Sequence, residues 1–558
     1  MSKRSAFRSF SIAAAVCVLG VAVPSLAAQA PGGNLIDVRW LAENLTNPDL
    51  LILDASPAPV YAQQHIPGAV NVNVLVYGGR EPAGEMENLF QSWGVSPGKK
   101  LVLYDQGGTF MATRLLFSLN FHGFPEEDLL LLDGGLSKWL EAGLPVTTEV
   151  RPPAKGTFRI GKPNEHLRAG LAEVLVASGD QARSTLVEAL GPDWHFGEVA
   201  PFGRPGHIPF SALLPTPDLF RPDKTFKSPE ELRRMLAYLD VKPERRVYTY
   251  CGGGVAASAP FFALKFILGY PDVRLFVGSE LEWLGDEREL PHWTYDAPFL
   301  MRDAVWLQGW GSRMLRTYVG ARMSIVDIRS PEAFGHGHVP FALNVPAEIF
   351  KSHVESPDKL ADALGAAGVD KSLEAVVVSG AGLTKDAALA FLMLERAGQK
   401  RVSVLMDPVD RWVELGFVTK EPAVVGPKTA AGAATATAPK AYPRDFRGGV
   451  IIADPSSSKG IYPKVFIWSG EVVPGTAPAP DAKAAHVPYM GLLNGDGTPK
   501  AAKEIWKILS DAGVPRYGEL VCFSEDPGEA ASNYFILKLM GYPDVKVLWN
   551  RPSGANPR

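Results

Sequence analysis

The sequence has only three cysteines among its 558 residues, which excludes a disulfide scaffold and any cysteine-rich zinc or iron–sulfur site. It also lacks a strong charge of either sign, because its formal net charge is −4 at pH 7. We therefore expect no nucleic-acid partner. Charged residues make up 21% and hydrophobic residues 46%, which is typical of a folded globular chain and excludes a disordered one.

Long apolar runs are also missing, except near the N-terminus between about Ile12 and Val23. Basic residues precede this run and small residues follow it, which is the order of a secretory signal peptide. The run is short for a membrane span, which needs about 20 residues. We predict a signal peptide over residues 1–27 and an exported, periplasmic mature protein without stable membrane insertion. A retained N-terminal anchor stays open as the alternative.

A short histidine-containing turn recurs four times along the rest of the chain, at His65, His207, His338 and His486. An apolar stretch precedes each turn, a second one runs into a small-residue loop and a helical pattern, and a third closes the repeat. Short apolar strands that alternate with helices are typical of parallel sheets covered on both faces. The sequence therefore predicts an α/β fold of four tandem domains, each with a central, mostly parallel sheet and helices on both faces.

The repeats set the predicted domain boundaries. We expect four units, over residues 34–150 (unit 1), 155–296 (unit 2), 297–422 (unit 3) and 441–558 (unit 4). The Ala/Thr/Pro-rich stretch 423–440 has no apolar periodicity and indicates a linker. Because no comparable stretch separates the first three units, we expect those three to pack together.

The strongest chemical signal is the segment YTYCGGGVAAS in unit 2. A strand ends at Cys251, and a loop of small residues follows it, formed by Gly252, Gly253, Gly254, Val255 and Ala256. Ligand sites of open α/β sheets lie at the carboxyl ends of strands. The glycines let main-chain N–H groups turn inward, and a helix that we expect to begin at Val255 adds its positive end. Both features favour a thiolate with a lowered pKa, so we predict that Cys251 is a nucleophile that can also hold a persulfide anion.

This order of strand, histidine turn, Cys-led glycine loop and helix resembles the rhodanese (sulfurtransferase) family over nearly the whole mature chain. The loop CGGGV is similar to that of the mercaptopyruvate sulfurtransferases, whereas thiosulfate sulfurtransferases more often place a basic residue where this chain has Gly252. The resemblance implies that Cys251 takes a sulfane sulfur from a small donor, thiosulfate or 3-mercaptopyruvate. The persulfide then passes it to a thiol or cyanide acceptor, or to a protein acceptor, with no metal and no cofactor.

The other three units depart from this pattern, because Asp105, Ser379 and Ser524 stand at the cysteine position of units 1, 3 and 4. None of these side chains can carry a sulfane sulfur, so we predict one active unit and three inactive ones. Cys522 lies in an apolar strand of the degenerate unit 4, and we interpret it as a structural thiol. The four turn histidines recur without a cysteine, so we expect them to fix their turns.

The predicted substrate contacts also depart from the family pattern. The family usually has Asp-x-Arg at the end of the first strand, where unit 2 has Glu188 and Leu190. We therefore predict that Arg204, just before the histidine turn, binds an anionic donor; a solvated surface position is the alternative. Four aromatic residues precede the same turn and form either a pocket wall or a plain loop: Trp194, His195, Phe196 and Phe202.

Two other functions compete with an exported sulfurtransferase. Cell-cycle dual-specificity phosphatases have a related fold and a loop of the form Cys-x5-Arg, in which the arginine clamps phosphate oxygens. Ala257 stands at that arginine position here, which argues against a phosphatase. A non-enzymatic persulfide carrier or scaffold, which delivers sulfur to a protein partner, stays open because three units lack the cysteine.

Overall fold

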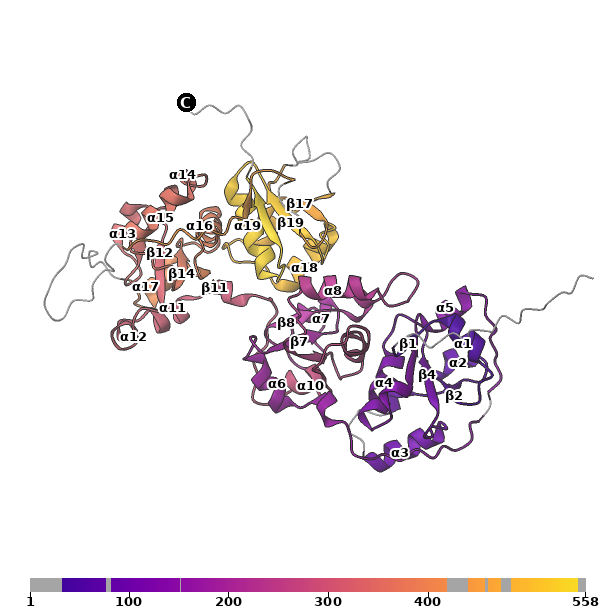
Figure 1. Cartoon of the computed structure of the whole chain (residues 1–558). Coiled ribbons are helices and arrows are strands. Elements are labelled where there is room, and N and C mark those ends of the chain that lie inside the picture. The colour runs from indigo at the N-terminus through magenta and orange to yellow at the C-terminus, as the bar shows by residue number, and fades with distance from the viewer. Residues whose placement is uncertain are drawn as a thin grey trace, which may run out of the picture.

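The computed structural model describes residues 33–76, 82–150, 152–418, 440–456, 460–472 and 483–549. The predicted signal peptide and nearly all of the predicted linker lie outside these residues, so both stay predictions. The described residues form four five-stranded sheets in which every strand pair is parallel (Figure 1). Each sheet has the same order, with its first, fifth, fourth, second and third strands side by side. The α/β fold of four repeated units is therefore confirmed.

Units 1 and 2 share one succession of strands and helices. Unit 1 consists of β1 (Leu35–Ile36), α1 (Val38–Asn44), β2 (Leu50–Asp54), α2 (Ala58–Gln63), β3 (Val70–Asn71), η1 (Val74–Val76), α3 (Ala83–Ser92), β4 (Lys100–Tyr104), α4 (Met111–Phe121), η2 (Glu126–Asp128), β5 (Leu129–Leu132) and α5 (Gly135–Glu141). Unit 2 consists of η3 (Glu165–Leu167), β6 (Arg168–Ala169), α6 (Leu171–Ser178), β7 (Ser184–Glu188), α7 (Pro192–His195), β8 (Ser211–Leu213), η4 (Thr216–Leu219), α8 (Pro229–Tyr238), β9 (Arg246–Tyr250), α9 (Ser258–Phe262), the π-helical turn η5 (Ala263–Ile267), β10 (Val273–Phe276) and α10 (Ser279–Trp283).

Units 3 and 4 repeat this succession, with fewer helices among the described residues of unit 4. Unit 3 consists of η6 (Pro298–Leu300), β11 (Met301–Arg302), α11 (Ala304–Gly311), α12 (Arg313–Tyr318), β12 (Met323–Asp327), α13 (Pro331–His336), β13 (Leu343–Asn344), α14 (Ala347–Ser352), α15 (Pro357–Ala366), β14 (Glu374–Val378), α16 (Lys385–Arg396), β15 (Arg401–Leu405) and α17 (Val409–Glu414). Unit 4 consists of β16 (Ile451–Ile452), β17 (Lys464–Trp468), β18 (Lys483–His486), η7 (Tyr489–Leu492), α18 (Ala502–Asp511), β19 (Glu519–Phe523), α19 (Pro527–Leu539) and β20 (Val545–Leu548). No helix among the described residues is long and apolar enough to cross a bilayer.

Alternate residues of the central strands enter separate cores on the two faces of each sheet. In β4, Leu101 and Leu103 join the cluster that units 1 and 2 share, whereas Val102 and Tyr104 join a cluster on the opposite face. This explains why the strands read as nearly continuous apolar runs, since a parallel sheet covered on both faces has no solvent side. Trp139, Trp283 and Trp412 are fully buried behind the fifth strands of units 1, 2 and 3.

The units pack in pairs. Helices α4 and α9 join units 1 and 2, where the rings of Phe117 and Phe261 meet at 5.1 Å. Helices α16 and α19 join units 3 and 4 in the same way, with Phe391 against Phe535 at 4.9 Å. The expectation that the first three units pack together is therefore wrong in one respect: unit 3 packs chiefly on unit 4, because the apolar faces of α16 and α19 match across the predicted linker.

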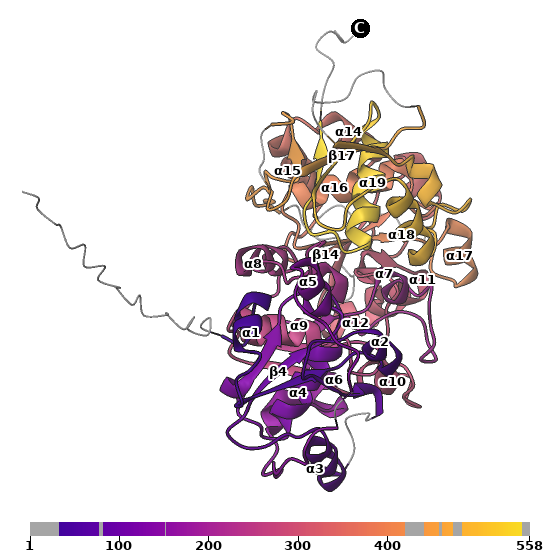
Figure 2. The ribbon, with the colours of Figure 1, turned by 90° about the vertical axis from the view of Figure 1, so that its right-hand side faces the viewer.

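Units 2 and 4 also touch each other, which links the two pairs (Figure 2). The Tyr238 hydroxyl donates to the Gly518 carbonyl at 3.0 Å, and Arg516 Nη2 donates to the Leu213 carbonyl at 2.8 Å. Unit 2 therefore has a partner on two sides, unit 1 beside its cysteine loop and unit 4 beside its edge strand β8.

Candidate active site

The structure places Cys251 directly after β9, at its carboxyl end, in the middle of the unit 2 sheet between β10 and β7. Its side chain is buried, with 2% of its surface exposed, while Gly253 in the same loop is exposed. The Gly254 N–H donates to Cys251 Sγ at 3.1 Å. The sulfur therefore lies where the sequence predicts it, inside a curled loop whose crest reaches the surface.

Most other N–H groups of this loop are free to bind an anion. Those of Gly252, Gly253, Val255 and Ala256 make no hydrogen bond within the described residues. These groups belong to the loop that begins at Cys251, and successive main-chain N–H groups in such a loop can bind an anion. The loop can hold a negatively charged atom on Cys251 without a metal.

Unit 1 shows the same loop with an anion already in place. The Asp105 carboxylate accepts hydrogen bonds from the Gly107 and Ala112 N–H groups at 2.7 and 3.0 Å and from the Thr109 hydroxyl at 2.5 Å. Asp105 stands at the position of Cys251, so its carboxylate takes the place that an anion on the cysteine would have. The comparison supports the interpretation of the unit 2 loop as an anion cradle.

Close packing fixes the shape of the cysteine loop. Gly254 has φ +79°, and a Cβ there would lie 2.6 Å from the Val277 carbonyl oxygen, so this position requires glycine. A Cβ on Gly252 would lie 2.4 Å from Cζ of Phe202, whose ring therefore rests directly on the loop. Phe202 thus forms a wall of the site, and Trp194 lies beside it at 5.5 Å.

The helix after the loop begins later than the sequence suggests. We expected it from Val255, but α9 begins at Ser258, and residues 255–257 form a turn. The Ser258 hydroxyl donates to the Val255 carbonyl at 2.7 Å and lies 2.9 Å from the Thr113 hydroxyl of unit 1. Unit 1 therefore contacts the start of the helix that follows the cysteine loop.

Ser279, the first residue of α10, supports Cys251 and could not be identified from unit 2 alone. Its hydroxyl accepts the Cys251 N–H at 3.1 Å and donates to the Phe276 carbonyl at 2.7 Å. Ser279 has φ +50°, a conformation that is uncommon for residues other than glycine. Unit 1 has Gly135 at this position, with φ +52°, so a comparison of the two units would have revealed the change.

Unit 1 also contributes a buried cation to the cysteine loop. Arg114 in α4 is 1% exposed, and its Nη1 donates to the Gly254 carbonyl at 3.4 Å. Arg114 could not be recognised from the sequence of unit 2, because it belongs to a unit without a cysteine. A positive charge beside the loop favours an anion on Cys251.

The guanidinium of Arg204, the predicted donor-binding residue, contacts the main chain of another segment. Its guanidinium donates to the main-chain carbonyls of Trp283, Leu284 and Leu290 at 3.0, 3.0 and 2.5 Å. Three of its five N–H donors are therefore used to tie the histidine turn to the end of α10. Contact between Arg204 and a donor molecule stays a prediction, and these bonds argue for a structural role.

The other candidates of the sequence analysis have structural partners. The ring nitrogens of His65, His207 and His338 bond to the carbonyls of Tyr61, His195 and Phe334, as expected of residues that fix a turn. In unit 3 the Ser379 hydroxyl donates to the Gly382 carbonyl. In unit 4 the Ser524 hydroxyl donates to Glu529 at 2.6 Å.

The two cysteines among the described residues differ in their surroundings. Both are free thiols, which disfavours a disulfide between them. Cys522 lies inside β19 with no exposed surface, and burial raises the pKa of its thiol well above the ordinary value. Cys522 therefore stays a thiol, whereas Cys251 has a hydrogen-bond donor on its sulfur.

One group of metal-ligand type occurs among the described residues: Glu188, His195 and His207, whose ligand atoms lie within 4.8 Å of one another. Both nitrogens of His195 already bond to carboxylates, of Glu188 at 2.6 Å and of Asp296 at 2.8 Å. The two imidazole rings are stacked at 3.5 Å with an interplanar angle of 3°, so their nitrogen lone pairs run parallel and do not converge. We therefore assign no metal to this group.

The fold and the loop together define a class of protein. Its members have an α/β domain in which a cysteine follows a central strand and a main-chain N–H group of the next loop donates to its sulfur. The family model of the rhodanese-like domain matches residues 37–142 and 312–415, which lie in units 1 and 3. The chain is 34% identical to the "Probable 3-mercaptopyruvate sulfurtransferase" of Pseudomonas aeruginosa over 279 residues, which are 46% of this chain and 96% of that protein. This chain belongs to the rhodanese family.

Other relatives carry related names. The thiosulfate sulfurtransferase of Azotobacter vinelandii is 27% identical over 265 residues (46% of this chain, 96% of that protein). The sulfur carrier protein TtuD of Thermus thermophilus is 29% identical over 269 residues (45% and 93%). Among solved structures, SseA from Escherichia coli matches at 26% identity with a TM-score of 0.40, covering 44% of this chain and 98% of that one. The relatives are thus mainly sulfurtransferases.

Proposed function

We propose that the chain is a sulfurtransferase that carries a sulfane sulfur on Cys251 as a persulfide, between a small donor and a thiol or cyanide acceptor. One observation carries the proposal: the Gly254 N–H donates to Cys251 Sγ, and further N–H groups of the same loop have no partner among the described residues. A persulfide anion needs such donors around its outer sulfur.

The chemistry balances without a cofactor. The Cys251 thiolate attacks the sulfane sulfur of the donor, a new S–S bond forms, and the bond from that sulfur to the rest of the donor breaks. With thiosulfate the leaving sulfite keeps the electron pair; with 3-mercaptopyruvate the leaving carbon keeps it and then takes the proton of the transferred S–H, which yields pyruvate. An acceptor thiolate or cyanide then removes the outer sulfur and restores the Cys251 thiolate.

The charges around the loop are better suited to stabilising a persulfide anion on Cys251 than to binding a donor with two negative charges. Arg114 lies beside the loop, but it is buried in the contact between units 1 and 2. Arg204, the predicted donor-binding cation, already donates to three carbonyls. The main-chain N–H groups are then the principal anion-binding groups, and we expect 3-mercaptopyruvate, with one carboxylate, to be the better donor than doubly charged thiosulfate.

A persulfide carrier that serves a protein acceptor is the second candidate. It is favoured by the 2% exposure of Cys251 and by the Phe202 ring on Gly252, which restrict small molecules. A relative of this chain also has the name of a sulfur carrier protein. In this case Cys251 would accept sulfur but turn over small acceptors slowly.

Steady-state assays separate these candidates. The wild type and Cys251→Ser are compared with thiosulfate and with 3-mercaptopyruvate, with cyanide or a small thiol as the acceptor. An enzyme gives turnover with at least one donor, and the substitution abolishes it. Persulfide formation without turnover supports the carrier, and equal turnover of both proteins refutes a role for Cys251.

We also propose that the chain is exported, which rests on the sequence of residues 1–27 alone. Cell fractionation of the full chain and of a chain without these residues tests it. The full chain should be found in the periplasm and the shortened one in the cytoplasm.

A further inference from the structure

A buried cluster of ionisable side chains lies directly behind the cysteine loop. Glu280, the second residue of α10, is 1% exposed, and its N–H donates to the Cys251 carbonyl at 3.0 Å. Its carboxyl group faces that of Glu188, which has no exposed surface, and the buried atoms Glu280 Oε1 and Glu188 Oε1 have no other hydrogen-bond partner among the described residues. Two buried carboxylates that face each other repel, and a proton held between them removes this repulsion. Burial, Glu188 and Cys251 together raise the pKa of Glu280 to about 11.

His195 anchors this pair from the other side. It is fully buried, with Nδ1 2.6 Å from Glu188 Oε2 and Nε2 2.8 Å from Asp296 Oδ1. Burial alone would lower the pKa of His195, but the carboxylates of Asp296 and Glu188 outweigh it and raise the pKa to about 9. Both ring nitrogens thus donate to carboxylates, and the imidazolium charge balances Glu188.

The neighbouring units show that the fold does not require these ionisable groups. The turn histidine stacks on Tyr61 in unit 1, at 3.8 Å, and on Phe334 in unit 3, at 3.9 Å; in unit 2 its stacking partner is His195. Unit 1 likewise has the buried Leu136 at the position of Glu280, three residues before the core tryptophan. An aromatic ring and an apolar side chain are therefore sufficient for the fold at these two positions. Unit 2, which carries the cysteine, has His195 and Glu280 there, and we look for the cause in the chemistry of the cysteine.

Resting on the proposed function of Cys251, we propose that Glu280 and Glu188 keep one shared proton behind its sulfur, with His195 and Asp296 as the positioning residues of the pair. If the pair lost that proton, a second negative charge would stand behind the sulfur, and like charges disfavour each other. The thiolate and the persulfide anion would both become less stable. None of these four side chains needs to touch the donor or the acceptor.

Few other groups near the cluster change charge around neutral pH. The Tyr250 hydroxyl donates to Glu188 at 3.2 Å, and burial raises its pKa well above the ordinary value. Burial and the charge of His195 lower the pKa of His207 to about 4. Arg114 of unit 1 faces the cysteine loop, and Arg516 of unit 4 acts on Asp296; both keep their positive charge.

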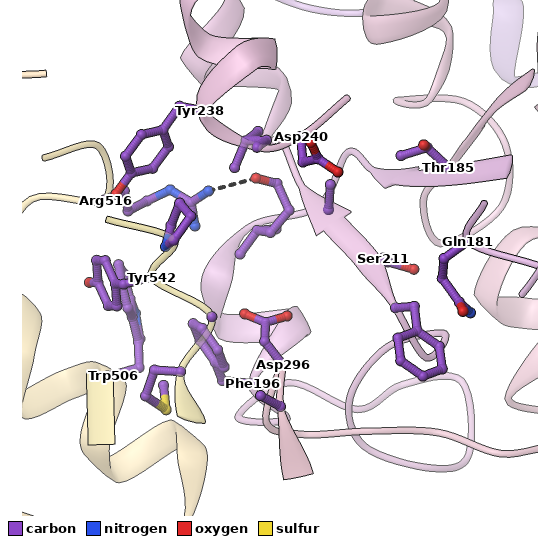
Figure 3. A pocket seen from close by; sticks show the side chains of 18 of the residues that line it. Gln181, Thr185, Phe196, Ser211, Tyr238, Asp240, Asp296, Trp506, Arg516 and Tyr542 are labelled. Atoms are coloured by element: carbon purple, nitrogen blue, oxygen red, sulfur yellow. Dashed lines mark hydrogen bonds between the residues drawn. The ribbon is translucent and has the colours of Figure 1, made fainter. Parts of the chain in front are cut away.

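The cluster ends at a cavity of about 360 Å³ between units 2 and 4, lined by Asp296 together with Phe196 of unit 2 and Trp506, Arg516 and Tyr542 of unit 4. Figure 3 shows the Asp296 carboxylate directed into this cavity, on the side of Phe196 and Trp506. A Cβ on Gly541 of unit 4 would lie 2.1 Å from Asp296 Oδ2. Unit 4 therefore packs directly against the outer anchor of the charge cluster.

Two measurements on the whole protein test the proposal. The first counts the protons released when the protein unfolds in urea at pH 8. The folded protein holds protons on Glu280 and His195 that the unfolded chain releases, because the ordinary pKa values lie near 4.5 and 6.5. Glu280→Gln and His195→Gln should each release about one proton fewer than the wild type. Glu173→Gln is the matched control: it makes the same substitution at a glutamate that is ion-paired with Arg274, so it should release the wild-type number.

The second measurement follows the rate of Cys251 alkylation against pH. His195→Gln keeps a hydrogen-bonding side chain without the positive charge, so its midpoint should rise by about one pH unit, which makes alkylation at pH 7 several-fold slower. Glu280→Gln is neutral like the protonated acid, so its midpoint should stay within about 0.3 units of the wild type. Should Glu280→Gln fail to fold, Glu280→Leu, which copies unit 1, takes its place in both measurements.

The outcomes separate this proposal from the proposed function. Unchanged proton release in Glu280→Gln, or an unchanged alkylation midpoint in His195→Gln, overturns the charge cluster whether or not Cys251 carries sulfur. If Cys251 fails to accept sulfur, the proposed sulfurtransferase function is refuted. The expected results for proton release and for the alkylation midpoint do not change in that case. A purely structural role would lower the stability of the variants without moving the midpoint.

Discussion

A single methyl group on Gly252 should slow sulfur transfer, because the Phe202 ring already occupies the space. Gly252 is not among the residues with positive φ, so alanine fits its backbone conformation and only the ring opposes the new side chain. The added Cβ would lie 2.4 Å from Cζ and 2.7 Å from Cε2 of Phe202, whereas carbon atoms in contact are about 3.5–4.0 Å apart. Either the ring or the loop must therefore move by about 1 Å.

The ring cannot retreat freely, since Trp194 lies next to it at 5.5 Å, so part of the displacement falls on the cysteine loop. Displacements of this size in a reacting group cost up to about 100-fold in rate. We expect Gly252→Ala to lower kcat/KM with 3-mercaptopyruvate by about 10- to 100-fold, while the melting temperature changes little.

A double-mutant cycle with Phe202→Ala tests the cause. In the Phe202→Ala background the methyl group has room, so Gly252→Ala should cost less than about threefold there. An equal loss in both backgrounds would mean that the methyl group acts on the main chain and not through the ring. No loss in either background would refute the close packing of ring and loop.

The remaining predictions concern the loop, the second cysteine and pH. Gly254→Ala should abolish sulfur transfer in both the wild-type and the Phe202→Ala background, because its φ of +79° and the Val277 carbonyl oppose any side chain; recovery in either would contradict this. Cys522, whose thiol pKa burial raises, should stay unmodified after iodoacetamide treatment of the native protein at pH 8 while Cys251 reacts, as peptide mass spectrometry can show. His195 has a pKa of about 9 in the folded protein and 6.5 ordinarily, so its proton stabilises the fold fully below pH 6.5 and loses this effect as the pH rises through 9. The difference in melting temperature between the wild type and His195→Gln should therefore shrink over this range, and a constant difference would argue against a charged His195.

The repeated architecture could be predicted from the sequence because each unit repeats local signals. A parallel sheet buried on both faces leaves apolar runs such as that of β4, and a turn histidine with a main-chain partner recurs in the same place. Cys251 could be placed for the same reason, since a strand followed by three glycines ends at a sheet edge. These features depend on residues that are close together in the chain.

Contacts between distant segments could not be predicted in this way. Ser279 and Glu280 reach Cys251 from the start of α10, and His195 is connected to Asp296 across about a hundred residues. The three carbonyls that Arg204 contacts also belong to a segment about 80 residues away, so the sequence beside the turn could not reveal them. A position-by-position comparison of unit 2 with unit 1 would have found Ser279 and Glu280.

The pairing of the units was missed for a related reason. A flexible linker tells where a chain can bend but not which surfaces meet, and the apolar faces of α16 and α19 bring units 3 and 4 together. Contacts between units could not be predicted at the site either: Arg114 and Thr113 reach the cysteine loop from unit 1, which has no cysteine. Units without the nucleophile thus still shape its surroundings.

Intact-mass spectrometry after brief treatment with 3-mercaptopyruvate tests most directly whether Cys251 holds a second sulfur atom on its main-chain donors. The account predicts a gain of about 32 Da, one sulfur atom, that a reducing thiol removes and that Cys251→Ala lacks. A gain of the same size in Cys251→Ala, or none in the wild type with either donor, would contradict it.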